Sequence, residues 1–163
     1  YFRDKLYAAF KIIISKTNDE LISFVNGVRA ETKTQSYEDI AFPRGVNGLG
    51  KYYSRNTIYT KGTPIHVRGA LLYNYYVNQN KITNKYPLIQ EGEKIKFIYL
   101  KTPNPMKEDC ISFFSQIPKE FNVDKYIDHK KQFEKSFLKP LENVLECIGW
   151  RSKKVVTIGS FLK

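Results

Sequence analysis

The sequence has 163 residues, of which 42% are hydrophobic and 26% are charged. This length is enough for one domain with a real core and, at most, a small sub-domain. The 27 lysine and arginine residues outnumber the 16 aspartate and glutamate residues, and the net charge of +11 favours a polyanionic partner, either nucleic acid or an anionic membrane surface. No apolar run approaches the roughly 18 residues of a membrane span, and no secretory leader is visible, which excludes these two classes from our expectations.

The N-terminal part of the chain is predicted to be helical. Apolar residues at helical spacing predict a first helix that ends at about Lys16, and Asn18 or Asp19 is expected to cap a second helix through Val28. The following stretch, EDIAFPRGVNGLGKYY, contains one proline and three glycines and is therefore predicted to be a loop. Because the first residue is Tyr1 rather than methionine, we expect the chain to be a fragment of a longer protein.

The positive charge is concentrated along the chain. Residues 1–40 carry six basic and six acidic side chains, residues 41–124 carry twelve and six, and residues 125–163 carry nine and four. Between Ile40 and Gln90 there is no acidic residue, but there are seven basic residues and seven of the twelve tyrosines. The basic residues are Arg44, Lys51, Arg55, Lys61, Arg68, Lys81 and Lys85. Cations neutralise phosphates and rings stack on bases, so this acid-free window fits nucleic-acid binding as well as it fits a solvated cationic face on a half-buried sheet.

His66 and Arg68 stand out within this window. They occur in KGTPIHVRGALLYNYY, where residues 65–67 are expected to be extended or turning and Gly69 to Asn78 are expected to be helical. Both side chains would then lie at a helix N-terminus, where free N–H groups and the helix dipole favour an anion such as phosphate. The alternative is that the two side chains donate hydrogen bonds to carbonyl groups of the preceding loop.

The second half of the chain predicts a small sheet followed by a long helical segment. Lys94 to Leu100 is the strongest predicted strand, and Cys110 to Phe114 is its expected antiparallel partner. From Val123 the pattern is helical, with a kink or restart at Lys139 and Pro140, where proline begins the second piece. The elements together predict an α+β fold with helical ends around a small antiparallel β sub-domain.

Lysines along the late helix are a second candidate for phosphate contacts. Lys131, Lys135 and Lys139 are four residues apart, which places them one above another, about 6 Å apart, along a helix. A solvated helix face has the same spacing. After it, RSKKVVTIGSFLK is expected to be a flexible basic tail with a short apolar end that a partner would cover.

The sequence contains few signs of chemistry. Cys110 and Cys147 have apolar neighbours and are expected to be reduced core thiols, since a zinc site with His66 and His129 would lack paired ligand spacing. Glu108 and Asp109 are one adjacent acidic pair, typical of capping or solvated side chains. With no phosphate loop, nucleophile elbow or two-metal aspartate cluster, the chain is expected to bind rather than to catalyse.

Four segments carry a resemblance to a known family. PIHVRGALLYN, GEKIKFIYL, NPMKEDCISF and IDHKKQFEKSFLKPLENVLECIGW resemble, in the same order and at similar spacing, the thumb domain of family B replicative DNA polymerases of T-even-type tailed bacteriophages. The resemblance covers nearly the whole chain and is clearest from about Glu38 to Trp150. It implies a thumb domain over residues 1–150 and a C-terminal tail over residues 151–163.

The resemblance implies a function and particular contact residues. The family thumb grips primer–template duplex DNA through phosphates, and the matching phosphate-binding residues here are Lys61, His66, Arg68, Lys135 and Lys139. The family's extreme C-terminus docks on the sliding clamp, and the matching apolar residues are Ile158, Phe161 and Leu162, although the tail lacks an acidic residue and a second aromatic residue often found there.

The resemblance also implies what lies outside the chain. The palm and exonuclease domains would belong to the parent polymerase, which would require Mg²⁺ and would act in the cytoplasm of an infected bacterial host. This fragment would need no cofactor, would carry no catalytic residue and would not polymerise alone. Two other readings stay open: a free-standing accessory protein that binds single-stranded nucleic acid, and a basic protein-binding module with an acidic partner.

Overall fold

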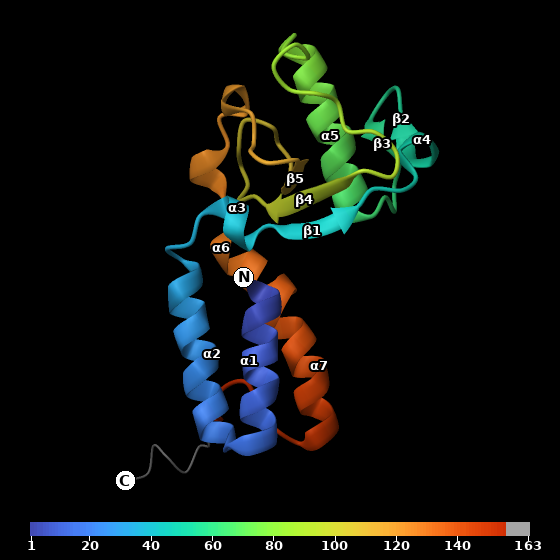
Figure 1. The fold of residues 1–163 in the computed structure, drawn as a ribbon. Helices are drawn as coiled ribbons and strands as arrows, with labels where there is room; N and C mark the ends of the chain where they lie inside the picture. The colour runs from blue at the N-terminus through green and yellow to red at the C-terminus, as the bar shows by residue number, and fades with distance from the viewer. Residues whose placement is uncertain (156–163) are drawn as a thin grey trace. The chain divides into compact units, whose positions relative to one another are not determined.

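The computed structural model describes residues 1–155, which fall into two compact units (Figure 1). Unit 1 combines Tyr1–Gln35 with the chain from Phe133 onward, and unit 2 comprises Ser36–Gln132. Helices occupy both ends of the chain, and the strands lie between them in the sequence. The predicted α+β class, with helical ends around a small antiparallel sheet, is confirmed.

Unit 1 is helical in its described part. Its elements are α1 (Phe2–Ser15), α2 (Asn18–Thr32), the π-helical turn η3 (Glu134–Leu138) and α7 (Lys139–Ile148). The prediction for α1 is confirmed. In α2 the predicted cap was wrong, because Thr17 caps the helix: its hydroxyl accepts the N–H of Glu20, and the Glu20 carboxylate accepts the N–H of Thr17. The helix also runs past Val28 to Thr32, which is buried.

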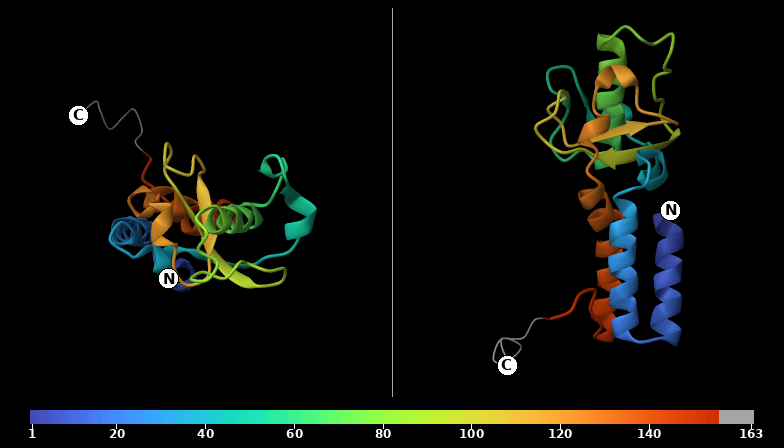
Figure 2. Two further views of the ribbon diagram at one scale, coloured as in Figure 1. Left: turned by 90° about the horizontal axis from the view of Figure 1, so that it is seen from above. Right: turned by 90° about the vertical axis from the view of Figure 1, so that its left-hand side faces the viewer.

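Aromatic side chains hold unit 1 together. Helices α1 and α2 lie side by side (Figures 1 and 2), and the ring of Phe2 stacks on Phe137, with 6.3 Å between ring centroids. Phe137 also packs against Phe133, whose ring lies 5.0 Å from the Arg29 guanidinium. Burying such rings supplies much of the hydrophobic free energy of a small helical unit. Phe137 therefore links the late helical segment to the first helix.

Pro140 changes the helix in the way that its chemistry requires. Proline has no N–H and its ring crowds the carbonyl group four residues earlier. The preceding residues form the wider turn η3, in which the N–H of Lys139 donates to the carbonyl of Glu134. Helix α7 then begins at Lys139, so the predicted restart is confirmed, with proline as its second rather than its first residue.

Unit 2 contains a small sheet and one long helix. Its elements are α3 (Tyr37–Ile40), β1 (Phe42–Gly45), α4 (Leu49–Tyr52), β2 (Tyr53–Ser54), β3 (Ile58–Tyr59), α5 (Ile65–Gln79), β4 (Lys94–Tyr99), β5 (Cys110–Phe113), η1 (Lys119–Phe121) and η2 (Asp124–Tyr126), and α6 (His129–Phe133) follows. The sheet has the antiparallel order β1-β4-β5, and β2 and β3 form a separate hairpin. The predicted pairing of the strands at 94–100 and 110–114 is confirmed, with each strand one residue shorter.

The prediction of a plain loop over residues 38–53 was wrong. Phe42–Gly45 is strand β1, which pairs with β4 so that Phe42 lies opposite Phe97. Pro43 is tolerated because β1 is an edge strand, where one side of the backbone needs no partner. Helix α4 is completed by Glu91, which accepts the N–H groups of Gly48 and Leu49 at 2.5 and 2.9 Å. These contacts are long-range, so composition alone could not predict them.

Helix α5 packs closely on strand β5, and this contact sets the position of His66 and Arg68. Residues 65–67 are helical rather than extended, because α5 starts directly after Pro64. The Ser112 hydroxyl donates to the His66 carbonyl at 2.8 Å. A Cβ at Gly69 would lie 2.7 Å from the Ser112 backbone nitrogen, closer than atoms can approach without movement. The absence of a side chain at Gly69 therefore allows α5 to approach the sheet.

Two other expectations need correction. The late helix does not start near Val123, because Ile127 bridges to Leu100 in extended conformation and α6 begins only at His129. Cys110 is a buried core thiol as predicted, but Cys147 is exposed. The buried side of α7 carries Leu141 and Leu145. Cys147 follows Leu145 by two positions and therefore points to the opposite side of the helix.

The packing of α5 gives a test based on two glycines. Gly69→Ala should destabilise unit 2 by about 1–3 kcal/mol through overpacking against Ser112. Gly27→Ala is the matched control, because Gly27 lies inside α2 with nothing within 4 Å of an added Cβ, and alanine there should stabilise by about 0.5–1 kcal/mol. Urea denaturation followed by circular dichroism measures both. Equal effects of the two changes would contradict the close approach at Gly69.

Candidate nucleic-acid interface

The sequence-predicted residues of unit 2 lie around the start of helix α5. Lys61 is exposed in the loop before the helix, His66 is its second residue and Arg68 its fourth. The structure thus confirms that His66 and Arg68 lie at a helix N-terminus, although the helix starts at Ile65 rather than at Gly69 as predicted. The side chains of His66 and Arg68 differ in their surroundings.

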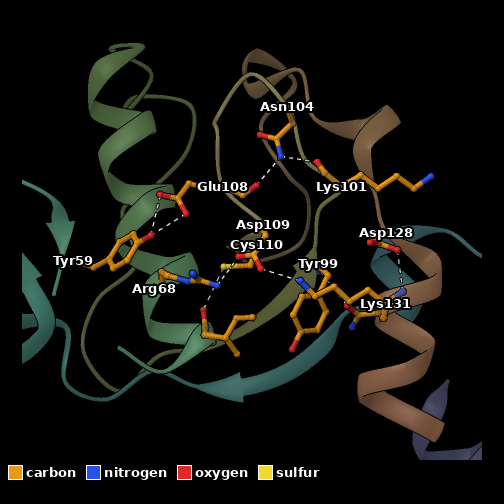
Figure 3. A network of polar contacts seen from close by, with 12 residues as sticks. Tyr59, Arg68, Tyr99, Lys101, Asn104, Glu108, Asp109, Cys110, Asp128 and Lys131 are labelled. Carbon is orange, nitrogen blue, oxygen red and sulfur yellow. Dashed lines mark hydrogen bonds and ion pairs between the residues drawn. The ribbon is translucent and has the colours of Figure 1, made fainter. Parts of the chain in front are cut away.

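Arg68 takes part in a network of ion pairs (Figure 3). Its Nη2 lies 2.6 Å from Oδ1 of Asp109, and Nζ of Lys131 lies 2.9 Å from Oδ2 of the same carboxylate. Within the described residues, Nε of Arg68 is buried and has no hydrogen-bond partner, so Asp109 provides the main compensation for the guanidinium. Among residues 1–155, Arg68 donates to Asp109 and not to carbonyls of the preceding loop, so this alternative is not supported for Arg68.

The pKa values in this network follow from burial and charge. Burial alone would raise the pKa of Asp109, but the hydrogen bond from Lys131 and the charge of Arg68 outweigh it and hold the pKa below its usual value. Burial also raises the pKa of the neighbouring Cys110 thiol to about 12, which keeps this thiol neutral at physiological pH. The network therefore contains an ionised carboxylate shared by two cations and no reactive thiolate.

The loop between β4 and β5 supports this network. The hydroxyl of Tyr59 donates to the carboxylate of Glu108 at 3.0 Å, and the side-chain amide of Asn104 donates to the carbonyls of Lys101 and Glu108 (Figure 3). Glu108 thus accepts a hydrogen bond from Tyr59, and Asp109 pairs with Arg68 and Lys131. The expectation that the two acidic residues only cap or are solvated was therefore wrong. Sequence reasoning missed this because Tyr59 and Glu108 are 49 residues apart.

His66 lies in a cationic rather than an acidic environment. Its ring centroid is 6.4 Å from that of Phe97, and burial together with the charge of Arg44 lowers the pKa of His66 below its ordinary value. The Arg44 guanidinium lies 4.4 Å from the centre of the Phe42 ring on strand β1. Arg44 was absent from our predicted contacts, although its place in the acid-free window was a signal for it.

Lys135 and Lys139 belong to unit 1. Lys135 lies in η3 and Lys139 is the first residue of α7, and both side chains are exposed. They line a shallow groove together with three glutamates, Glu134, Glu142 and Glu146. Lys131, by contrast, is bound to Asp109, with its Nζ 4.8 Å from the Tyr99 ring. The three lysines therefore do not form one uniform ladder.

Ile158, Phe161 and Leu162 lie outside the described residues. In residues 1–155 no group of three or more histidine, cysteine, aspartate or glutamate side chains is arranged to hold a metal ion. No helix in this part of the chain has the length and apolar character needed to cross a membrane.

Comparison with known proteins places the chain beside viral polymerases. No family model matches it. It is 28% identical over 151 residues, 90% of this chain, to the DNA-directed DNA polymerase of Enterobacteria phage T4. It is 31% identical over 112 residues, 66% of this chain, to the DNA-directed DNA polymerase of Escherichia phage RB69. The chain spans only 16% and 12% of the lengths of these two relatives. Over most of its length, the chain is therefore similar to one part of two phage DNA-directed DNA polymerases.

Proposed function

We propose that this chain is the thumb domain of a family B phage DNA-directed DNA polymerase and that it holds primer–template duplex through phosphate contacts that ignore sequence. The observation that carries the proposal is the 28% identity to the T4 polymerase across 90% of the chain. The net charge of +11 gives the chain the electrostatic attraction that such binding requires. The nucleotidyltransferase activity would belong to the whole polymerase, of which this chain is a part.

Exposed cations without ion pairs support the duplex contacts. Within the described residues, Lys61, Lys135 and Lys139 form no ion pair, so their charges are available to phosphates. A lysine that contacts phosphate releases counterions from DNA and steepens the salt dependence of binding. The glutamates of the groove next to Lys135 and Lys139 repel phosphate, so local charge alone does not predict a DNA contact there. Substitution of these two lysines is therefore the sharper test of the proposal.

Arg68 and His66 would contribute in a different way. Arg68 and Lys131 share Asp109, so the three groups together carry one net positive charge in a fixed position. We propose that this positions one face of the Arg68 guanidinium toward a phosphate. The charge of Arg44 opposes protonation of His66, and a phosphate beside both groups would favour the imidazolium.

The rest of the replication machinery would lie outside residues 1–155. We propose that residues 1–150 form the thumb and that Ile158, Phe161 and Leu162 in the 151–163 tail dock on a sliding clamp. The palm and exonuclease domains of the parent would hold the catalytic groups and Mg²⁺, and the enzyme would act in the cytoplasm of the infected host. A free-standing accessory protein, or a protein-binding module, would bind duplex DNA more weakly than a thumb does.

The duplex contacts can be tested through salt dependence. If about four or five phosphates are neutralised, the logarithm of the affinity for a labelled primer–template hairpin should fall with log salt at a slope of about −4. The double change Lys135→Glu, Lys139→Glu should reduce this slope by about two units. Fluorescence anisotropy at several salt concentrations provides the measurement.

A second charge reversal is the matched control. Lys11 and Lys16 are exposed in or next to α1, also in unit 1, and Lys11→Glu, Lys16→Glu changes the net charge equally. The control should keep most of the slope. Similar losses in both double variants would show that net charge, and not a contact by Lys135 and Lys139, drives binding.

The shared carboxylate of Asp109 predicts an effect on stability. Asp109→Asn leaves two half-buried cations without their partner and should cost about 1–2 kcal/mol at pH 7, with allowance for partial exposure. Because the folded pKa of Asp109 is lowered, its contribution is present above the ordinary carboxyl pKa and is lost as pH falls. Urea titrations of the variant should therefore depend less on pH below about pH 5 than those of the wild type. Glu31→Gln, which breaks the more exposed pair with Lys5, should cost less; an equal cost would argue against a special role for Asp109.

The position of His66 predicts a pH effect on DNA binding. In the free protein, burial and Arg44 disfavour the imidazolium, whereas a nearby phosphate would favour it. DNA binding should therefore take up a proton and tighten as pH falls below about 7, by up to about tenfold for each unit by which phosphate raises the pKa. His66→Gln should remove this pH dependence and His129→Gln should keep it. A wild-type affinity that does not change with pH would place His66 away from the DNA.

A further inference from the structure

The hairpin β2–β3 has features that the duplex contacts do not use. It follows α4 directly and lies beside α5 (Figure 1). Tyr53 pairs with Tyr59 and Ser54 with Ile58, so three residues, 55–57, form the turn. The Thr57 hydroxyl donates to the carbonyl of Tyr59 and is also hydrogen-bonded to the Ser54 hydroxyl, each at 2.9 Å, and these bonds define the shape of the turn. Although it is short, the hairpin therefore has a defined conformation.

Backbone strain occurs at the end of this turn. Ile58 has a φ of 69°, a left-handed conformation that a β-branched residue adopts only at a cost. Such strain is found where the surrounding structure or a function requires it. Here it closes the turn and returns β3 to α5, and it leaves Arg55 and Asn56 exposed at the tip.

The three tyrosines of this region have different environments. The ring of Tyr52 packs next to Gly48, and its neighbour Lys51 lies over it at 5.1 Å. The hydroxyl of Tyr59 is bound by Glu108, and the ring lies 5.7 Å from the Arg68 guanidinium (Figure 3). Tyr53 is 59% exposed, and within residues 1–155 its side chain makes neither a hydrogen bond nor a ring contact. Tyr53 is thus the aromatic residue of the hairpin that is free to receive a ligand.

The charge around Tyr53 favours a phosphate-linked ligand. Lys51, Arg55 and Lys61 are exposed and form no ion pair within the described residues. The nearby carboxylates are already bound: Glu91 by the N–H groups that begin α4, and Glu108 by Tyr59. As directly paired residues of two antiparallel strands, Tyr53 and Tyr59 project from the same face of the hairpin, so Tyr53 lies on the face that meets Arg68.

We infer that the β2–β3 hairpin is a binding site for single-stranded DNA, in which an unpaired base stacks on the ring of Tyr53 and Arg55 contacts an adjoining phosphate. Stacking on an exposed ring requires a base whose face is open, as in a single strand. Within a duplex, the neighbouring base pairs cover the faces of each base. The site is therefore separate from the proposed duplex contacts. It does not depend on them.

The test compares single-stranded and duplex DNA on the same protein. Binding of a labelled oligothymidine and of a blunt duplex would be measured by anisotropy for the wild type, Tyr53→Ala and Tyr53→Phe. Tyr53→Ala should weaken single-strand binding about tenfold, and Tyr53→Phe, which keeps the ring, should remain within about twofold of the wild type. Duplex binding should change by less than about twofold in both.

An exposed tyrosine elsewhere is the matched control. Tyr7 on α1 is 61% exposed, so Tyr7→Ala removes a ring of equal exposure and should leave single-strand binding unchanged. The inference is overturned if Tyr53→Ala binds the single strand like the wild type, if Tyr7→Ala loses as much, or if Tyr53→Phe is as weak as Tyr53→Ala. Loss of duplex binding alone would count against the proposed function and leave this site standing. Loss of the Tyr53 effect alone would count against this site and leave the proposed function standing.

Discussion

The carboxylate of Asp109 is the interaction on which the arrangement of unit 2 depends. It joins Arg68 on α5 to Lys131 on α6, two residues that are 63 positions apart in the sequence and belong to different helices. Because a half-buried cation without a partner is costly, each of these side chains needs Asp109 to keep its position. The carboxylate in turn stands next to β5, so one acidic residue orients two helices against the sheet. Its position also defines which cations are compensated and which are free.

The ion pairs of Asp109 separate the cations that are bound within the fold from those whose charge is available to a ligand. Arg68 and Lys131 are bound within the fold, whereas the exposed lysines at the start of α5 and at the junction of η3 and α7 have no ion-pair partner among the described residues. A polyanion interacts most strongly with the lysines that have no ion-pair partner, since Asp109 already neutralises part of the positive charge of Arg68 and Lys131. The positive charge of the chain is thus a surface property with a definite location, and net charge alone does not describe it.

The close contact of α5 with β5 links the fold to the candidate site. Gly69 lets the helix approach Ser112, whose hydroxyl binds the carbonyl of His66, and this contact holds the first turn of α5 against the sheet. The hairpin β2–β3 is attached through the hydrogen bond from Tyr59 to Glu108. The exposed aromatic residue Tyr53 therefore lies on a hairpin that is itself hydrogen-bonded to the rest of unit 2.

The sequence by itself determined the local features of this protein. Helical spacing in α1, the apolar strand β4 and the restart at Pro140 follow from residues that are close in the chain, because periodicity and proline geometry act within one or two turns. The acid-free window and the placement of His66 and Arg68 at a helix N-terminus were equally local, although residues 65–67 belong to the helix and are not extended as expected. The tertiary structure decided what the sequence could not: that Phe42–Gly45 is a strand, that Cys147 is exposed, that Arg68 pairs with Asp109 and that Tyr53, but not Tyr59, is free. The strand, the ion pair and the binding of Tyr59 depend on partners 40 or more residues away, namely Phe97, Asp109 and Glu108, and the exposure of Cys147 depends on which side of α7 is buried. No local pattern specifies which distant groups will meet, since that choice is made by packing of the whole unit.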